Sequence, residues 1–233
     1  MKYLSIDTET SGLSFENCQM LSFGGILEDT KTKLPLIECP KINVYITSKK
    51  ISGEPFALNM NASIIKAISG FNLLNRTEEK VKFGNDHNCI FLTAEDFSYY
   101  FYLWLLVEHE GHSIYKEYLE PERWYKTSAS LVIKVTELMS KYKKIYLTPA
   151  GKNFSTFDKN FIDPLLSNIS RSVEIIKFRS RVLDPAILYV DWVNDDALPS
   201  LSTCKERAGL DPLVTHDALD DAWDVIELLR KNY

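Results

Sequence analysis

The sequence predicts a single α/β domain, with strands gathered at its start and helices interleaved later. The chain has 233 residues, of which 45% are hydrophobic, and this is enough material for one sizeable core. Apolar residues alternate with polar ones over the first fifty positions, which is typical of strands. Apolar residues at helical spacing recur from residue 54 onwards. No repeat or linker divides the chain, so residues 1–233 form one domain in this interpretation, with a helical insertion around 83–122.

The first part of the chain predicts a meander of antiparallel strands. Residues 2–7 alternate and end before the turn residues TSG, and two further strands are expected over 20–29 and 36–47. The polar run DTKTK at 29–33 separates them as a turn. A helix is then expected over 54–69, where Asn61 and Ser63 are candidate interruptions.

The second part predicts mostly helices. Residues 71–93 are polar, and Gly84, Asn85 and Asp86 mark a loop. Thr93 followed by Asp96 is typical of a helix N-cap, and Pro121 suits the first turn of another helix. The expected elements are helices over 94–110 and 121–143, a short strand over 144–150, a loop leading into a helix over 153–166, a strand at the start of 172–192, and helices over 200–209 and 217–232.

Composition excludes some classes of protein. A net charge of −5 argues against a protein that coats nucleic acid, although not against an enzyme that meets nucleic acid through metal ions. The most apolar stretch, residues 97–107, is too short to span a bilayer, and the start is unlike a signal peptide. We therefore expect a cytoplasmic protein with no membrane partner. The four cysteines form no CxxC pair, which favours reduced, buried thiols over zinc or redox chemistry.

Two other patterns have competing interpretations. The aromatic run over 97–104 predicts a helix buried against the sheet, with a homodimer contact and a stacking platform for bases as alternatives. His109 and His112 lie in an HxxH pattern that lacks the HExxH spacing of helical zinc sites. A solvated helix end is the interpretation favoured for them.

Acidic residues gather in three places. Asp7 and Glu9 are two positions apart on a strand and so share a face, where two carboxylates are costly unless a cation binds between them. Asp158 lies at a helix start, where the helix dipole favours an anion. In HDALDDAWD, Asp217 is expected to cap the last helix, with His216 just outside it and Asp221 in its first turn. For each place a purely structural interpretation exists: a charged strand end, a helix cap, and a capped, solvated helix face that carries Asp217, Asp221 and Asp224, with His216 as a bystander. With Asp221 as a ligand, Asp217, Asp220 and Asp224 would be the cap and the solvated face.

Taken in order, DTETSGL, NFSTFD and HDALDDA resemble the three motifs of the DEDD exonucleases, in the histidine-bearing (DEDDh) subgroup. The resemblance implies a ribonuclease-H-like fold, with a mixed central sheet flanked by helices. It implies that Asp7, Glu9, Asp158 and Asp221 hold two divalent cations, Mg²⁺ or Mn²⁺, as oxygen ligands prefer. It also implies that His216 is the general base, and an unperturbed histidine titrates near neutral pH.

The resemblance implies supporting roles as well. Thr8 would offer its backbone to the terminal sugar of the substrate, and Leu13 would contact the terminal base or simply pack at the strand end. Asn153 would contact a phosphate or hold its loop, and Phe157 would stack on a base or pack internally.

The implied activity is hydrolysis from the 3′ end of single-stranded RNA or DNA to nucleoside 5′-monophosphates. The spacing from Asn153 to Asp158, the following DKNFI and the segment RSRVLDPAILY are similar to oligoribonucleases, which act on short RNA. Asp217, where those enzymes usually have arginine, and the long segment 83–122 depart from them. A proofreading-type exonuclease on single-stranded DNA and a non-catalytic binding module on the same fold are the alternatives.

Overall fold

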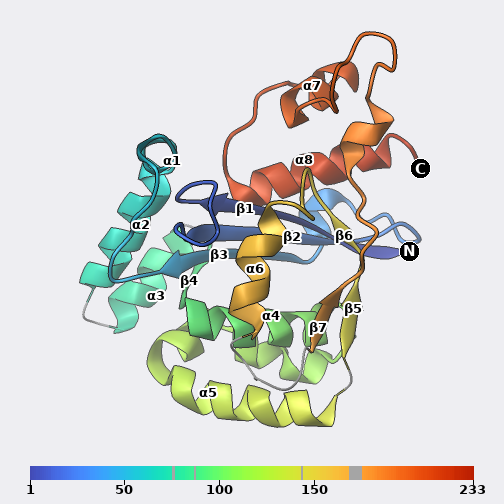
Figure 1. The fold of residues 1–233 in the computed structure, drawn as a ribbon. Coiled ribbons are helices and arrows are strands. Elements are labelled where there is room, and N and C mark those ends of the chain that lie inside the picture. Colours follow the sequence, from blue (N-terminus) through green and yellow to red (C-terminus); the bar gives the residue numbers. More distant parts are fainter. Residues whose placement is uncertain (75–76, 87, 143, 168–174) are drawn as a thin grey trace.

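A mixed five-stranded sheet forms the centre of the protein (Figure 1). The computed structural model describes residues 1–74, 77–86, 88–142, 144–167 and 175–233. The strand order is β4-β3-β2-β1-β6, and β1, β2 and β3 form the expected antiparallel meander. β6 pairs with β1 and β4 with β3 in parallel. The strands are β1 (Lys2–Thr10), β2 (Met20–Asp29), β3 (Lys41–Thr47), β4 (Ile90–Thr93) and β6 (Pro149–Ala150). The predicted α/β class, with a mixed central sheet flanked by helices, is confirmed.

A second, two-stranded sheet continues from β6. Its strands β5 (Ile145–Leu147) and β7 (Ile176–Phe178) pair in parallel, and only Thr148 separates β5 from β6. The strand expected over 144–150 is therefore divided between two sheets. Of the strand expected from residue 172, residues 172–174 lie outside the described part of the chain.

Helix α8 (Ala218–Arg230) covers one face of the central sheet. It lies across β1 and β2 (Figure 1), and its apolar side chains Ala222, Val225 and Ile226 pack with Tyr3 and Ile26 in one buried cluster. Helix α7 (Leu201–Arg207) and the 3₁₀ turn η3 (Pro185–Leu188) lie beside α8. The last helix of the chain is thus seated on its first strand.

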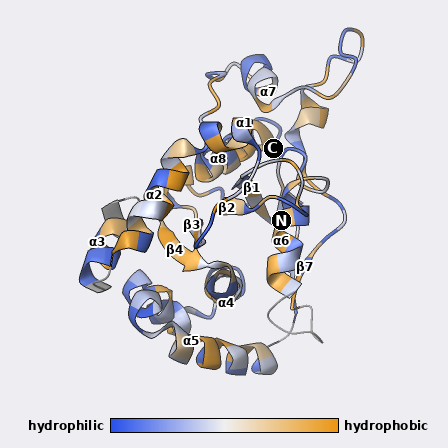
Figure 2. Ribbon diagram, turned by 60° about the vertical axis from the view of Figure 1, so that its left-hand side comes forward, coloured by the Kyte–Doolittle hydropathy of each residue, from blue (hydrophilic) through white to orange (hydrophobic). Residues whose placement is uncertain are grey.

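The opposite face is covered by α4 (Ala94–Glu108), with α5 (Pro121–Lys141) and α6 (Asp158–Ser167) around it. Phe97, Phe101 and Tyr102 in α4 are fully buried, and the rings of Phe97 and Phe101 stack with centroids 5.7 Å apart. The aromatic run therefore forms a buried helix, as predicted, and leaves no stacking platform for bases there. The hydrophobic colouring of β4 in Figure 2 marks the strand that continues this core toward the sheet edge.

The segment around 83–122 contributes β4, α4 and the 3₁₀ turn η2 (Ser113–Leu119). Thr93 caps α4 as expected, because its Oγ1 accepts from the Asp96 N–H at 3.1 Å.

Helices α1 (Pro55–Met60), α2 (Ala62–Leu73) and α3 (Thr77–Asp86) lie together at one end of the sheet (Figure 1). The predicted interruption at Asn61 is confirmed, whereas Ser63 lies inside α2. The loop expected at Gly84, Asn85 and Asp86 is wrong, because α3 continues to Asp86. Tertiary packing explains the difference. A side chain at Gly84 would lie 2.7 Å from the Tyr125 Oη of α5, so this glycine permits a close helix contact.

The cysteines are all free, as predicted, and Cys39, Cys89 and Cys204 are buried while Cys18 is partly exposed. Among the residues that the structure describes, no helix is both long enough and apolar enough to span a membrane.

Candidate active site

The end of β1 presents two carboxylates toward α8. Asp7 pairs with Gly24 and Glu9 with Ser22 across to β2. Alternation places both acids on the face of Ser5, whose Oγ donates to the Ala222 carbonyl of α8 at 2.8 Å. Glu9 is buried and Asp7 partly buried, so both lie under the start of α8.

The start of α8 brings a histidine and a third acid to the same place. Asp217 caps the helix by accepting from the Leu219 N–H at 3.0 Å and the Asp220 N–H at 3.3 Å, as predicted. One turn in, Asp221 is buried. Side-chain ligand atoms of Glu9, His216 and Asp221 all lie within 4.8 Å of one another.

His216 reaches this cluster from a strained backbone. Its φ is +53°, in the left-handed region that costs most residues about 1–2 kcal/mol. The side chain stays exposed. The imidazole is therefore held at the solvent side of the cluster, where water has access to it.

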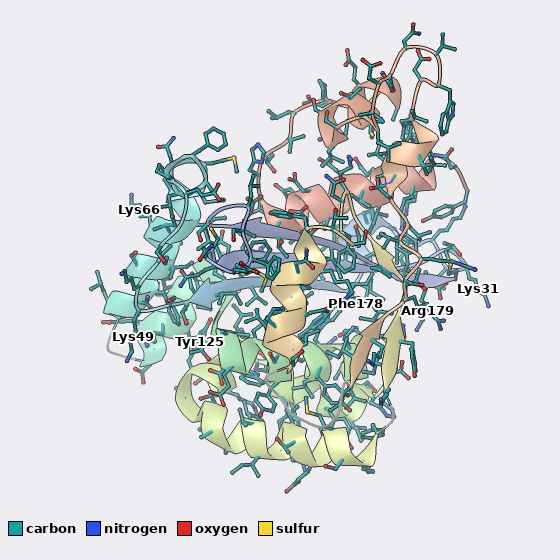
Figure 3. The ribbon with its side chains drawn as sticks, in the orientation of Figure 1. Lys31, Lys49, Lys66, Tyr125, Phe178 and Arg179 are labelled. Carbon is teal, nitrogen blue, oxygen red and sulfur yellow. The ribbon has the colours of Figure 1, made fainter. Side chains whose placement is uncertain are left out.

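Asp158 is brought in from the other face of β1. It begins α6 and is buried, and the Thr8 Oγ1 donates to its Oδ1 at 2.7 Å. The preceding loop is anchored by buried Phe154, whose ring lies 5.2 Å from that of Phe178 at the end of β7 (Figure 3). Thr8 thus contacts a predicted ligand through its side chain, whereas its backbone role toward a substrate stays a prediction.

The four carboxylates interact electrostatically. Burial raises the pKa of Glu9, of Asp158 and of Asp221 to about 7 each. Burial raises the pKa of Asp7 well above its usual range, and the charges of Asp158, Asp221 and Glu9 add to that rise. The neighbouring His216 lowers the pKa of Asp221 and so opposes the effect of burial. Without a counter-charge, folding therefore holds four mutually repelling acids together at neutral pH.

A divalent cation fits this donor set. The Oδ1 of Asp221 is buried and has no hydrogen-bond partner in the described structure, although an unpaired buried acceptor is costly. Carboxylate oxygens are the ligands that Mg²⁺ and Mn²⁺ prefer. Among the residues that the structure describes, no second histidine or acid cluster of this kind occurs. The His109 ring contacts Glu110 at 2.6 Å instead.

The remaining predicted residues differ in burial and in the contacts they make. Leu13 is 75% exposed, so it does not pack at the strand end, and its N–H donates to the Glu54 Oε1 at 3.1 Å. Asn153 is exposed with a φ of +60°, and its N–H donates to Asp184 Oδ2 at 3.1 Å. Phe157 is partly buried, with its ring 5.3 Å from that of Phe161. Contacts of these residues with a substrate stay predictions.

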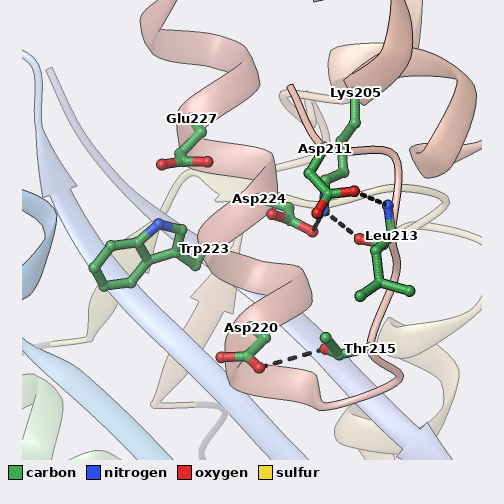
Figure 4. Close-up of a pocket in the computed structure, with 8 residues that line it drawn as sticks. All are labelled: Lys205, Asp211, Leu213, Thr215, Asp220, Trp223, Asp224 and Glu227. Atoms are coloured by element: carbon green, nitrogen blue, oxygen red, sulfur yellow. Dashed lines mark hydrogen bonds and ion pairs between the residues drawn. The ribbon is translucent and has the colours of Figure 1, made fainter. Parts of the chain in front are cut away.

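One expectation about the acidic helix is wrong. Asp224 does not belong to a solvated face, because its Oδ2 accepts from the buried Lys205 Nζ of α7 at 2.6 Å. The same ammonium donates to the Leu213 carbonyl, in the loop that leads to His216 (Figure 4). Sequence reasoning missed Lys205. The only available signal was its place on the apolar side of a short helix.

We expect Lys205→Met to lower the free energy of unfolding by about 3 kcal/mol, because it leaves the Asp224 charge buried without its partner. Urea unfolding measures the effect. The double variant Lys205→Met/Asp224→Leu should recover much of the loss, and Lys116→Met at an exposed site should change stability by less than about 0.5 kcal/mol. Equal stability of Lys205→Met and the wild-type protein would show that the pair contributes nothing.

Gly24 allows α8 to approach the sheet beside Asp7. A Cβ on this residue would lie 2.2 Å from the Ala218 carbonyl carbon and 2.3 Å from the Leu219 nitrogen. Both are backbone atoms, so the clash could be relieved only if the start of α8 moved. This glycine therefore sets the position from which His216 and Asp221 reach Glu9.

We expect Gly24→Ala to lower the free energy of unfolding by about 1–3 kcal/mol through overpacking, because the start of α8 must move to relieve the clash. Urea unfolding measures the effect. Gly70→Ala is the control, since its Cβ would meet only Phe83 ring atoms, at 3.2 Å or more. Wild-type stability in Gly24→Ala would contradict this role.

Comparisons with known proteins give structural similarities only. No known sequence family matches the chain, and no curated protein matches it by sequence. The solved structures that it resembles include E. coli Exonuclease I in complex with a dT13 oligonucleotide, with a TM-score of 0.47 and 15% identity over 99% of this chain. The zinc-bound form of the same protein with single-stranded DNA gives a TM-score of 0.46 and 13% identity over 98% of this chain. The chain spans 40% and 39% of the length of those two chains.

Proposed function

We propose that this protein is a metal-dependent 3′→5′ exonuclease that hydrolyses single-stranded nucleic acid to nucleoside 5′-monophosphates. One observation carries the proposal: Glu9, His216 and Asp221 bring their ligand atoms within 4.8 Å of one another. The buried Asp158 and the partly buried Asp7 act electrostatically on the same group. Carboxylates held this close together repel one another and do not stabilise the fold. This favours a site that binds cations over a purely structural role.

Divalent cations are the groups that these residues would hold. Asp7, Glu9, Asp158 and Asp221 are the proposed ligands, with the unpaired Oδ1 of Asp221 as one ligand atom. When bound, two such ions would neutralise the acids and stabilise the charge that develops on the phosphate and on the leaving 3′ oxygen. This is the two-metal mechanism expected for phosphodiester hydrolysis.

The other proposed roles belong to side chains of the protein. His216 stands exposed beside Glu9 and Asp221, so its imidazole is placed to take a proton from an attacking water. Thr8 fixes Asp158 through its hydroxyl. Leu13, which is exposed and follows Glu9 by four positions, is the proposed apolar contact for the terminal base. Asn153 and Phe157 are the further proposed substrate contacts.

The proposal is tested with end-labelled RNA and DNA, from dinucleotides to long single strands, incubated with magnesium. A 5′ label should give a ladder that shortens from the 3′ end, with nucleoside 5′-monophosphates as products and no products in EDTA. The shortest substrate cleaved, and the ratio of RNA to DNA rates, separate a short-RNA exonuclease from a DNA-directed one. Tight binding of the same strands without cleavage, in protein shown to bind Mn²⁺, would instead establish a non-catalytic binding module.

A further inference from the structure

The acid Glu9 lies at an irregularity of the sheet. Glu9 pairs with Ser22, but the next residue, Thr10, pairs with Met20, so that Leu21 is the extra residue of β2. Bulges of this kind re-aim side chains and interrupt the ladder of backbone hydrogen bonds. The direction of Glu9 therefore depends on what holds the backbone at this position.

Asn61 provides that support from the break between α1 and α2. Its side chain is buried, and its Nδ2 donates to the Thr10 carbonyl at 3.1 Å. The Asn61 amide also interacts with the Glu9 carboxylate and opposes the rise that burial causes in its pKa. A single side chain thus acts on the backbone next to Glu9 and on Glu9 itself.

The backbone of Asn61 is fixed by both helices. Its N–H donates to the Ala57 carbonyl at 3.0 Å, and its carbonyl accepts from the Ile65 N–H at 3.0 Å. Because hydrogen bonds fix the backbone of Asn61 on both sides, the position of its side chain is well defined. A residue that supports a site of defined geometry needs this property.

Neighbouring contacts join the same two segments. The Glu54 N–H donates to the Ser11 carbonyl at 2.7 Å, and the Ser11 Oγ donates to the Ser52 carbonyl at 2.7 Å. These contacts lie in the loop that follows β1. Asn61 contacts the residue next to Glu9, and Asn61 and Ser11 are both buried. Because Nδ2 must face the Thr10 carbonyl, Oδ1 faces elsewhere, and it has no partner in the described structure. A buried oxygen without a hydrogen-bond partner is costly and calls for an explanation. We take the hydrogen bond from Asn61 to the Thr10 carbonyl as the reason that an amide side chain lies here.

We propose that Asn61 is a positioning residue that holds the Glu9 carboxylate in its orientation toward the metal site, by tying the Thr10 carbonyl to the break between α1 and α2. The inference rests on the proposed function, since it takes Glu9 as a metal ligand. Residues that orient metal ligands without touching the metal typically contribute 10- to 100-fold to metal affinity. Asn61 should therefore affect metal binding more than folding.

The experiment measures Mn²⁺ binding by calorimetry, without nucleic acid, for the wild-type protein, Asn61→Ala and Asn61→Leu. The leucine variant keeps the side-chain volume while removing the amide. Asn59→Ala, at an exposed position of α1, is the matched control. We expect about tenfold or greater loss of Mn²⁺ affinity for both Asn61 variants and wild-type affinity for the control. Circular dichroism and urea unfolding in EDTA identify the variants that are folded.

A second readout separates positioning from general damage. In the folded variants, the Mn²⁺ concentration for half-maximal activity should rise in step with the loss of affinity, and turnover should recover at saturating Mn²⁺. Wild-type Mn²⁺ affinity in either folded Asn61 variant would overturn the inference. Failure of the wild-type protein itself to bind Mn²⁺ at millimolar concentration would overturn the proposed function instead, so the two failures are distinguishable.

Discussion

Asp221→Asn is expected to lower turnover by at least about 10³-fold and to remove the rise in melting temperature that we expect Mg²⁺ or Mn²⁺ to cause in the wild-type protein. A bound metal supplies several kcal/mol of transition-state stabilisation, and each 1.36 kcal/mol corresponds to a tenfold change in rate. Ligand binding to the folded state raises stability by mass action, and that increase requires intact ligands. Initial rates and thermal unfolding with and without metal measure the two effects.

The same variant should be more stable than the wild-type protein when metal is absent, and the gain should depend on pH. Burial raises the pKa of Asp221 to about 7, well above the value of about 4 expected for an unfolded chain. Between these values the folded state binds more protons than the unfolded state, so the wild-type free energy of unfolding falls as pH rises from about 4 to 7. Asparagine carries no charge at any pH, so the gain should be small near pH 5 and on the order of 1–3 kcal/mol near pH 8.

Asp220→Asn is the control for this prediction, because Asp220 is the neighbouring acid of α8 and is exposed. It should retain wild-type turnover and the metal-induced rise in melting temperature. If Asp221→Asn gave the same gain in stability at pH 5 and pH 8, the buried charge would not be the cause, and the electrostatic account of the site would be wrong.

His216→Ala is expected to reduce turnover about 10²- to 10⁴-fold, the range typical for loss of a general base, while Mn²⁺ affinity and oligonucleotide affinity change little. The imidazole lies beside Glu9 and Asp221 but is exposed, so its removal leaves the buried carboxylates in place. Single-turnover rates, Mn²⁺ calorimetry and oligonucleotide binding in Ca²⁺ measure the three quantities separately.

The backbone of His216 requires a second variant, because alanine tolerates a φ of +53° poorly. Asparagine enters the left-handed region more readily than most residues, so His216→Asn removes the imidazole with less disturbance of the loop. Both variants should lose turnover to a similar extent. Near-normal turnover in His216→Asn, with His216→Ala impaired, would assign the effect to the loop and would exclude the imidazole as the base.

Local patterns predicted much of this fold. The alternation in β1, the caps at Thr93 and Asp217 and the break at Asn61 all depend on neighbours within a few positions, which a single sequence records. Part of the candidate site was predictable for a related reason: Asp7 and Glu9 are two positions apart, and His216 and Asp221 flank one helix start. These spacings fix relative directions once the element is known. The expectation that these groups join Asp158 in one site came only from the resemblance to the DEDD exonucleases.

Features that depend on distant contacts were not predictable in the same way. The helix through Gly84 packs closely against Tyr125 of α5, a contact that the local sequence does not record, and a glycine alone indicates a loop. Lys205 neutralises Asp224 across 19 positions, so the acids of the last helix looked more solvated than they are. Asn61 was visible as a helix break, but its contact with Thr10 spans 51 positions.

The seating of α8 on β1 also determines when the proposed site can form during synthesis of the chain. Asp221 leaves the ribosome more than two hundred residues after Asp7 and Glu9, a delay of roughly 10–40 s at typical elongation rates. Until then the apolar face around Tyr3 and Ile26, which α8 covers in the finished fold, has no partner. Three of the five residues of the proposed site, Asp7, Glu9 and Asp158, are therefore synthesised before His216 and Asp221. The proposed site is complete only when α8 docks on β1.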